Sequence, residues 1–214
     1  MFKKLFGAKK DNTPKIPEIM GLHLGGAFEL DALKLKLLEP QLVVEGVAKT
    51  QLIQAVGEVK LDENSTVLRF YTDDDAFLQV LLTGGMTENH IADVKLWHFY
   101  NTTAVGAKAD WDSLIGSGIS KPVYELEGGQ YQRVWESTGA ISPPVAMTEK
   151  TYSEGGETSE TDQFAMLYER ELEGKEYEFV LAVGEEKIID YQADRCFVVS
   201  TGINIQPADI TIIG

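Results

Sequence analysis

The sequence has little cysteine, few basic residues and no long apolar run. A single cysteine, Cys196, among 214 residues excludes an intramolecular disulfide and the disulfide-stapled secreted classes. Lys and Arg number 19 against 34 Asp and Glu, a formal net charge of −15. That excess of acid argues against a nucleic-acid partner, because neutralising phosphate needs a basic face. No stretch of about 18 apolar residues occurs, so the sequence predicts no membrane-spanning helix.

The short motifs of common catalytic sites are also missing. There is no G-x-S-x-G nucleophile elbow, no G-x-x-x-x-G-K-[ST] phosphate loop, no C-x-x-C and no H-E-x-x-H. On a strand, His90 and His98 would lie roughly 26 Å apart, too far to share a metal ion. The acids at residues 73–75 fail the EF-hand spacing, since Leu78 stands where that loop requires glycine. We therefore predict no catalytic residues, no metal site and no cofactor.

The pattern that is present is a two-residue period of apolar side chains. β-prone runs flank three turn signals, at residues 73–75, 128–129 and 173–175. Alternating Leu and Lys at residues 33–37 also favour a strand. About ten short strands at hairpin spacing predict a mainly β (β-rich α+β) protein. We expect antiparallel sheets, as a sandwich or a partly open barrel, with one or two short helices.

Few segments favour helix, and none separates two domains. Residues 109–115 predict one or two helical turns that end at Gly116. Residues 148–162 are polar and glycine-rich, which predicts a mobile loop. We therefore expect a basic, proline-containing N-terminal tail at residues 1–18 and a single β-rich domain at residues 19–214.

The charge is unevenly distributed along the chain. Residues 1–15 sum to +4, which leaves −19 for the remainder. A helix over residues 2–10 would gather apolar side chains on one face, the pattern of an interfacial anchor. The residues predicted to contact an anionic membrane surface or a partner are Phe2, Lys3, Lys4, Leu5, Phe6, Lys9 and Lys10.

This contact is expected to be weak. Four lysines at about 1 kcal/mol each correspond to millimolar binding. Stable attachment would therefore need a protein partner or a homo-oligomer. The alternatives are that the tail is a disordered solubilising terminus, or that it docks on the acidic face of another copy.

Large aromatic side chains form the second candidate site. A ligand groove would be lined by Trp97, Tyr100, Trp111 and Trp135. Large aromatic residues at strand spacing more often belong to a hydrophobic core, which is the alternative interpretation of these four residues. Cys196 is interpreted as a small buried apolar residue rather than a reactive thiol.

Together these features favour a non-enzymatic interaction protein of unknown biochemical activity. The alternative is an enzyme or a small-ligand-binding protein whose site is assembled from non-contiguous residues near Trp97, Trp111 and the 154–162 loop. The apolar stretch after the first lysines is too short for a secretory signal. We therefore expect a cytoplasmic protein whose tail could bind it peripherally to the inner membrane.

Several segments carry a family resemblance. They are Lys-Lys-Leu-Phe-Gly at 3–7, Val-Leu-Arg-Phe-Tyr at 67–71, Phe-Leu-Gln at 77–79, Val-Lys-Leu-Trp at 94–97 and Ala-Met-Leu-Tyr-Glu-Arg at 165–170. Over most of its length the chain resembles the YjfK-like family of bacterial proteins, which has no assigned activity and supplies no functional residues. Members tend to be encoded near a phage-shock-type membrane-stress protein. The resemblance therefore implies a cytoplasmic or inner-membrane-associated role related to membrane stress.

Overall fold

The computed structural model describes residues 15–135 and 142–213 of the chain. Its strands form one twelve-stranded sheet, accompanied by two short α-helices among the described residues. In chain order the elements are β1 (Ala27–Leu30), α1 (Ala32–Leu38), β2 (Thr50–Lys60), β3 (Ser65–Thr72), β4 (Ala76–Thr83), β5 (Ile91–Ala104), α2 (Lys108–Ser113), β6 (Val123–Leu126), β7 (Gly129–Arg133), β8 (Val145–Ser153), β9 (Thr158–Glu171), β10 (Tyr177–Ile189), β11 (Gln192–Asn204) and β12 (Ile210–Ile213).

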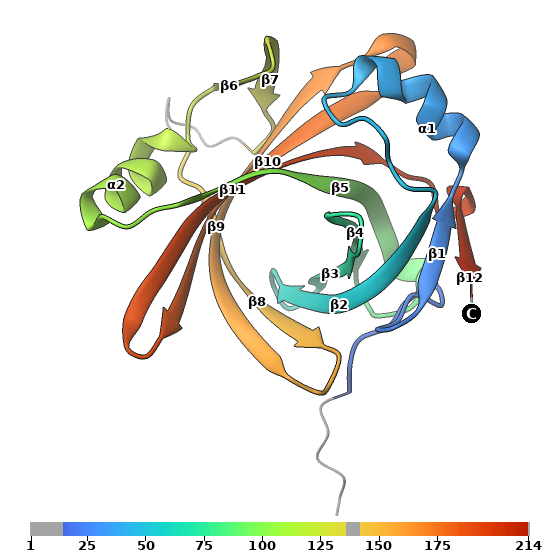
Figure 1. Cartoon of the computed structure of the whole chain (residues 1–214), viewed down its shortest axis with the longest axis horizontal. Helices are drawn as coiled ribbons and strands as arrows, with labels where there is room; N and C mark the ends of the chain where they lie inside the picture. The colour runs from blue at the N-terminus through green and yellow to red at the C-terminus, as the bar shows by residue number, and fades with distance from the viewer. Residues whose placement is uncertain (1–14, 136–141, 214) are drawn as a thin grey trace, which may run out of the picture.

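Eight of the strands close into an antiparallel barrel. Neighbours pair in the order β2, β3, β4, β5, β11, β10 and β9, and β8 joins the two ends by pairing with both β9 and β2 (Figure 1). The predicted mainly β fold with short helices is confirmed. Of the two architectures expected, the barrel is the one that forms, and it is closed rather than partly open.

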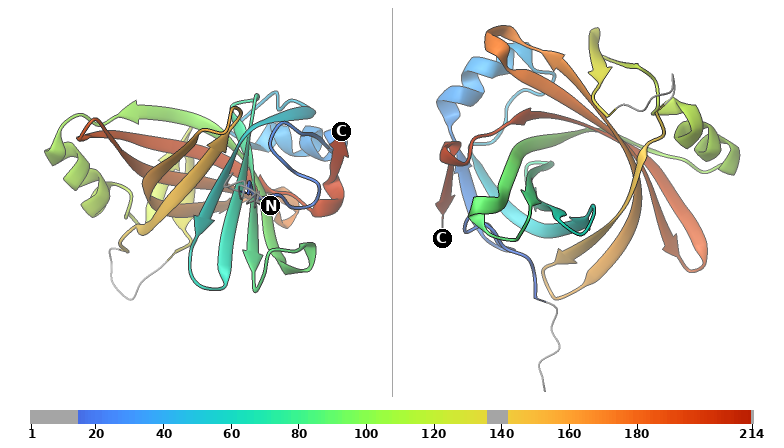
Figure 2. Two further views of the ribbon diagram at one scale, coloured as in Figure 1. Left: turned by 90° about the horizontal axis from the view of Figure 1, so that it is seen from below. Right: turned by 180° about the vertical axis from the view of Figure 1, so that it is seen from behind.

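The remaining elements cover the outside of the barrel. β1 pairs with the first residues of β2 and with β12, whereas β7 pairs with the last part of β9 and with β6. Figure 2 shows α1 and α2 at opposite sides of the barrel. Much of the barrel is therefore buried on its outer face as well as on its inner face.

Side-chain alternation sorts the strand residues between these two faces. On β3, Val67, Arg69 and Tyr71 point into the barrel, because successive side chains of a strand point to opposite faces. Leu68 and Phe70 lie on the outer face, in a core shared with β1 and α1. A second outer core lies over β9, β10 and β11, where β6, β7 and α2 cover the sheet. Polar side chains such as Arg69 are therefore interior by register.

Helix α1 replaces the strand predicted from the Leu-Lys alternation at residues 33–37. The Asp31 carboxylate caps it by accepting hydrogen bonds from the backbone N–H groups of Leu33 (2.8 Å) and Lys34 (3.3 Å). The helix buries Leu35 and Leu38 but leaves Leu33 and Leu37 exposed. The strand prediction was wrong because a cap and two buried positions outweigh a two-residue period.

The predicted mobile loop at residues 148–162 is also wrong, since it is a β-hairpin. Residues 145–152 of β8 pair with residues 158–165 of β9, around a short turn that contains Gly155 and Gly156. The segment is polar because one face of each strand is solvent-exposed, not because it lacks structure. This hairpin supplies the strand that closes the barrel.

The three predicted hairpins and the predicted helix are confirmed. The turns at 73–75, 127–128 and 173–175 connect β3 to β4, β6 to β7 and β9 to β10, respectively. Residues 108–113 form α2, and a further five-residue helical turn continues to Gly118, so the predicted end at Gly116 is wrong. The division of the chain at residue 18 stays a prediction, because residues 1–14 lie outside the described residues.

A fourth hairpin turn carries backbone strain that a substitution can relieve. Asp190 and Tyr191 connect β10 to β11 with φ of 49° and 63°, a two-residue turn in which Asn-Gly is favoured. The Tyr191 side chain is fully exposed and gains nothing from packing. We expect Tyr191→Gly to raise the free energy of unfolding by about 0.5–1 kcal/mol, as measured by urea denaturation. Gln192→Gly, one residue into the strand, should lower it instead; a destabilised Tyr191→Gly would contradict the assignment.

Candidate ligand-binding cavity

A cavity of about 380 Å³ lies inside the barrel. An eight-stranded barrel has an interior just wide enough for one small ligand, and volumes of 300–1,000 Å³ are typical of ligand sites. The lining residues are Leu61, Val67, Arg69, Gln79, Leu81, Asp93, Lys95, Trp97, Trp135, Val145, Ala146, Met147, Ala165, Leu167 and Leu181. They come from six of the barrel strands and two connecting segments.

The walls of the cavity are mostly apolar. Deep in the barrel they are formed by Ala165, Trp97 and Leu181, all of which are buried. At its mouth Leu61 and Val145 line the cavity while remaining 42% and 40% exposed. The apolar surface is therefore continuous from the solvent to the deep end.

Beyond the deep end, a polar network fills the barrel. The Arg69 guanidinium donates from Nη1 to Glu149 Oε2 (3.0 Å) and to Gln163 Oε1 (2.8 Å), and from Nε to Gln79 Oε1 (3.2 Å). The Tyr71 hydroxyl donates to the Glu149 carboxylate at 2.8 and 2.9 Å. Arg69 and Glu149 are 6% and 3% exposed, so they form a buried ion pair, and each also hydrogen-bonds to uncharged side chains.

A second carboxylate joins this network through Gln163. The Gln163 amide donates to Glu149 Oε2 and to Glu185 Oε1, both at 2.9 Å. Burial, followed by the charge of Glu149, raises the pKa of Glu185. Burial and then Glu185 raise the pKa of the Cys196 thiol to about 11, which makes the thiol unreactive at neutral pH. The interpretation of Cys196 as a non-reactive residue agrees with this environment.

The charged groups at the mouth are paired with each other. Lys95 forms an ion pair with Asp93, and its Nζ also lies 4.5 Å from the centre of the Phe179 ring. The Lys95 side chain is 11% exposed and the Asp93 side chain 35% exposed. This pair places one polar edge on an otherwise apolar mouth.

Two of the four predicted groove residues line this cavity. Trp97 and Trp135 do so. Tyr100 has the opposite orientation on β5, since it lies three residues from Trp97, and its hydroxyl donates to the Glu127 carboxylate. Trp111 packs outside the barrel, edge-on to Phe164 with ring centroids 5.9 Å apart. The structure therefore does not bring the four aromatic residues together.

The other predicted contacts lie elsewhere. Phe2, Lys3, Lys4, Leu5, Phe6, Lys9 and Lys10 are outside the described residues. Residues 154–162 contribute nothing to the cavity lining. The sequence reasoning missed Arg69, Gln79 and Glu149. Arg69 and Gln79 each interrupt a β-prone run with a polar residue, a signal that a strand has an interior polar partner, whereas Glu149 lies in a polar stretch that carries no such signal.

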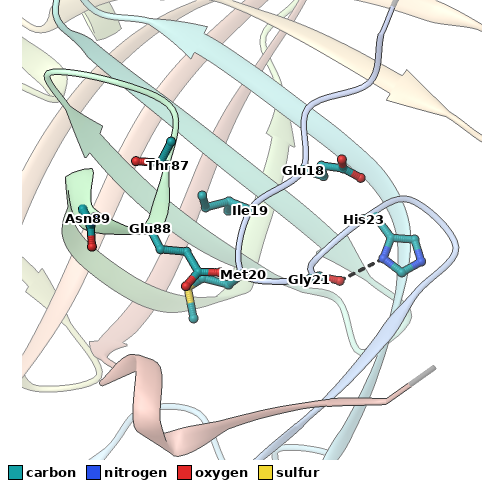
Figure 3. Close-up of a pocket in the computed structure, with 8 residues that line it drawn as sticks. All are labelled: Glu18, Ile19, Met20, Gly21, His23, Thr87, Glu88 and Asn89. Atoms are coloured by element: carbon teal, nitrogen blue, oxygen red, sulfur yellow. Dashed lines mark hydrogen bonds between the residues drawn. The ribbon is translucent and has the colours of Figure 1, made fainter.

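A larger depression on the surface is a poorer candidate. It measures about 650 Å³ and lies between the segment at residues 18–23 and the turn at residues 87–89 (Figure 3). It is wide open to solvent, and its side chains diverge. A hydrogen bond from this segment to itself, between His23 Nδ1 and the Gly21 carbonyl at 2.8 Å, is the polar contact drawn there. A ligand would bury little surface in it.

Two features are absent from the described part of the chain. Residues 15–135 and 142–213 contain no group of three or more His, Cys, Asp or Glu arranged to hold a metal ion. Within the same ranges, no helix has the length and apolar character needed to cross a membrane.

His98 is a buried histidine that should make stability depend on pH. Desolvation lowers its pKa below 6.5, and the Asp74 carboxylate, 3.6 Å from Nε2, only partly offsets this. His98 therefore binds a proton at a higher pH in the unfolded chain than in the folded protein. The stabilising contribution is complete above the unfolded pKa and is lost as the pH falls through about 6.5 and below.

We therefore expect the free energy of unfolding to fall between about pH 7.5 and 5.5, and His98→Leu to reduce that slope. Urea denaturation at several pH values measures it. His90→Gln is the matched control, because it removes a histidine that is less buried than His98. Identical slopes for His98→Leu and the unmodified protein would contradict the assignment.

Comparison with known proteins decides the family. Residues 1–211 match the model of a family described as "Protein of unknown function (DUF2491)". The chain belongs to the DUF2491 family. It is 32% identical over 218 residues to the "Uncharacterized protein YjfK" of Escherichia coli (strain K12), a match that spans 100% of this chain and 98% of that protein. The predicted YjfK-like resemblance is thereby confirmed. No solved structure matches the DUF2491 chain.

Proposed function

We propose that the protein is a non-enzymatic binding protein that holds one small molecule inside its barrel. The observation that carries this proposal is the 380 Å³ cavity, with an apolar lining that continues to an open mouth. A barrel built for stability alone would fill this space with side chains, because protein interiors are close-packed.

The chemistry of the lining supports binding rather than catalysis. Among the described residues that line the cavity, the groups able to act as a nucleophile, acid or base are Asp93 and Lys95, and these neutralise each other. The deeper polar side chains are engaged in the hydrogen bonds of the Arg69 network. A reaction would require at least one such group free to meet a substrate.

Fluorescence of N-phenyl-1-naphthylamine, a small apolar dye, tests the proposal. The dye should bind saturably with one site per chain and should quench Trp97 and Trp135 by energy transfer. Ala165→Phe, at a fully buried lining position, should weaken binding more than ten-fold. Val145→Trp enlarges a side chain at the exposed mouth of the cavity and should do the same without touching the core.

The matched control is Ala193→Trp, which adds the same side chain at an exposed position of β11 away from the cavity. It should bind the dye like the unmodified protein. Non-saturable binding, or equal binding by all four proteins, would refute a site inside the barrel.

We also propose that the N-terminal segment contacts an anionic membrane surface or a protein partner from the cytoplasmic side. The supporting observation is the charge asymmetry, +4 in residues 1–15 against −19 elsewhere. Flotation with anionic vesicles at low salt should recover more full-length chain than chain lacking residues 2–10. Equal recovery of the two chains would refute the membrane contact. Light scattering would then detect the alternative, a homo-oligomer.

A further inference from the structure

Every charged side chain that lines the barrel cavity already has a charged partner. Arg69 is paired with Glu149 at 3.0 Å, and Lys95 is paired with Asp93. From this pairing we infer that the ligand of the cavity is uncharged and largely apolar. The inference rests on the proposed binding function and specifies the class of molecule bound.

An anionic ligand has no cation to meet in the deep part of the cavity. Arg69 could receive it only by releasing Glu149, and that carboxylate is 3% exposed and would be left without its cation. Glu185, which shares Gln163 with Glu149, would add repulsion. Burying an uncompensated charge is strongly unfavourable, so an anion is excluded by the groups behind the cavity.

A cationic ligand meets the same difficulty at the mouth. The Asp93 carboxylate is paired with Lys95, and the face of the Phe179 ring, the kind of surface that binds cations, is already occupied by the Lys95 ammonium. A cationic ligand that displaced Lys95 from Asp93 would leave the Lys95 ammonium unpaired in a side chain that is only 11% exposed. The mouth therefore offers a polar edge but no attraction for a net charge.

An uncharged molecule fits both ends without displacing either pair. Eleven of the fifteen lining residues are apolar, and Trp97 and Trp135 present aromatic surface. Gln79 gives its side-chain oxygen to Arg69, which leaves its amide N–H groups to donate to an oxygen of the ligand. A compact hydrophobic molecule with a hydrogen-bond acceptor matches this set of groups.

Two dyes with one skeleton test the charge class. N-phenyl-1-naphthylamine is uncharged, and 1-anilinonaphthalene-8-sulfonate carries the same rings with a sulfonate. Both are titrated in about 0.5 M NaCl, which screens the overall negative charge of the protein. We expect the uncharged dye to bind at least ten-fold more tightly. Equal or tighter binding of the sulfonate would overturn the inference while leaving the binding function intact, and binding of neither dye would overturn both.

A substitution behind the cavity tests the physical reason. Glu149→Gln keeps the shape of the side chain but removes the carboxylate that is paired with Arg69. It should tighten sulfonate binding at least ten-fold and leave binding of the uncharged dye within two-fold. Unchanged sulfonate binding by the folded variant would show that Arg69 pairing does not set the selectivity and would overturn the inference. If this variant does not fold, the comparison of the two dyes on the unmodified protein still decides.

Discussion

Arg69→Met is expected to lower the free energy of unfolding by about 3–5 kcal/mol. The substitution removes the cation from the barrel interior and leaves the Glu149 carboxylate buried without it. The side-chain oxygens of Gln163 and Gln79 also lose the hydrogen bonds that they accept from Arg69. Urea denaturation followed by tryptophan fluorescence measures the change.

A double substitution separates the ion pair from simple loss of packing. Arg69→Met combined with Glu149→Gln removes both charges of the pair and should be clearly more stable than Arg69→Met alone, because residue 149 no longer carries an unpaired buried charge. Lys108→Met is the surface control: its pair with Asp112 is 76% and 57% exposed, so its loss should cost less than about 0.5 kcal/mol. An Arg69→Met protein as stable as this control would contradict the role of the network.

Gly202→Ala should cost about 3 kcal/mol, because β11 has no room for a side chain beside Trp97. A Cβ at residue 202 would lie 2.5 Å from Cε3 of Trp97 and 2.7 Å from the Leu96 carbonyl oxygen. The two residues are paired across β5 and β11, and the Trp97 ring is held between Phe77 and Phe179. Neither the Trp97 ring nor the Leu96 carbonyl can move away from an added Cβ.

Gly106→Ala is the matched control, since a Cβ at residue 106 would meet nothing within 4 Å. It should leave the free energy of unfolding within about 0.5 kcal/mol of the unmodified protein. The two melting curves, recorded side by side, test the prediction. Similar stability of Gly202→Ala and Gly106→Ala would show that the Trp97 contact is not rigid.

Local signals explain why most of the strands and hairpins were predictable. Turn residues at 73–75, 128–129 and 173–175 set the positions of three hairpins, and the flanking runs are rich in β-branched and aromatic residues. The predictions were wrong where one local pattern is compatible with two kinds of secondary structure. Residues 33–37 alternate as a strand would, yet the Asp31 cap and burial of two leucines select a helix.

The candidate site could be predicted only in part. Aromatic character identified Trp97 and Trp135, but nothing local distinguishes them from Tyr100 or Trp111, which lie outside the barrel. Whether an aromatic residue points inward depends on the register of its strand, and a shift of one residue reverses it. Register is set by pairing with other strands, so it was not available from the local sequence.

By itself, the sequence determined the strand content, the turns, the acidic balance with its basic first segment, and the family. Only the tertiary structure decided that β8 closes the sheet into a barrel, that the barrel keeps a cavity, and that Arg69 meets Glu149 inside it. Those two residues are 80 positions apart in the chain. Contacts over such distances depend on the register of eight strands together, and no short segment encodes it.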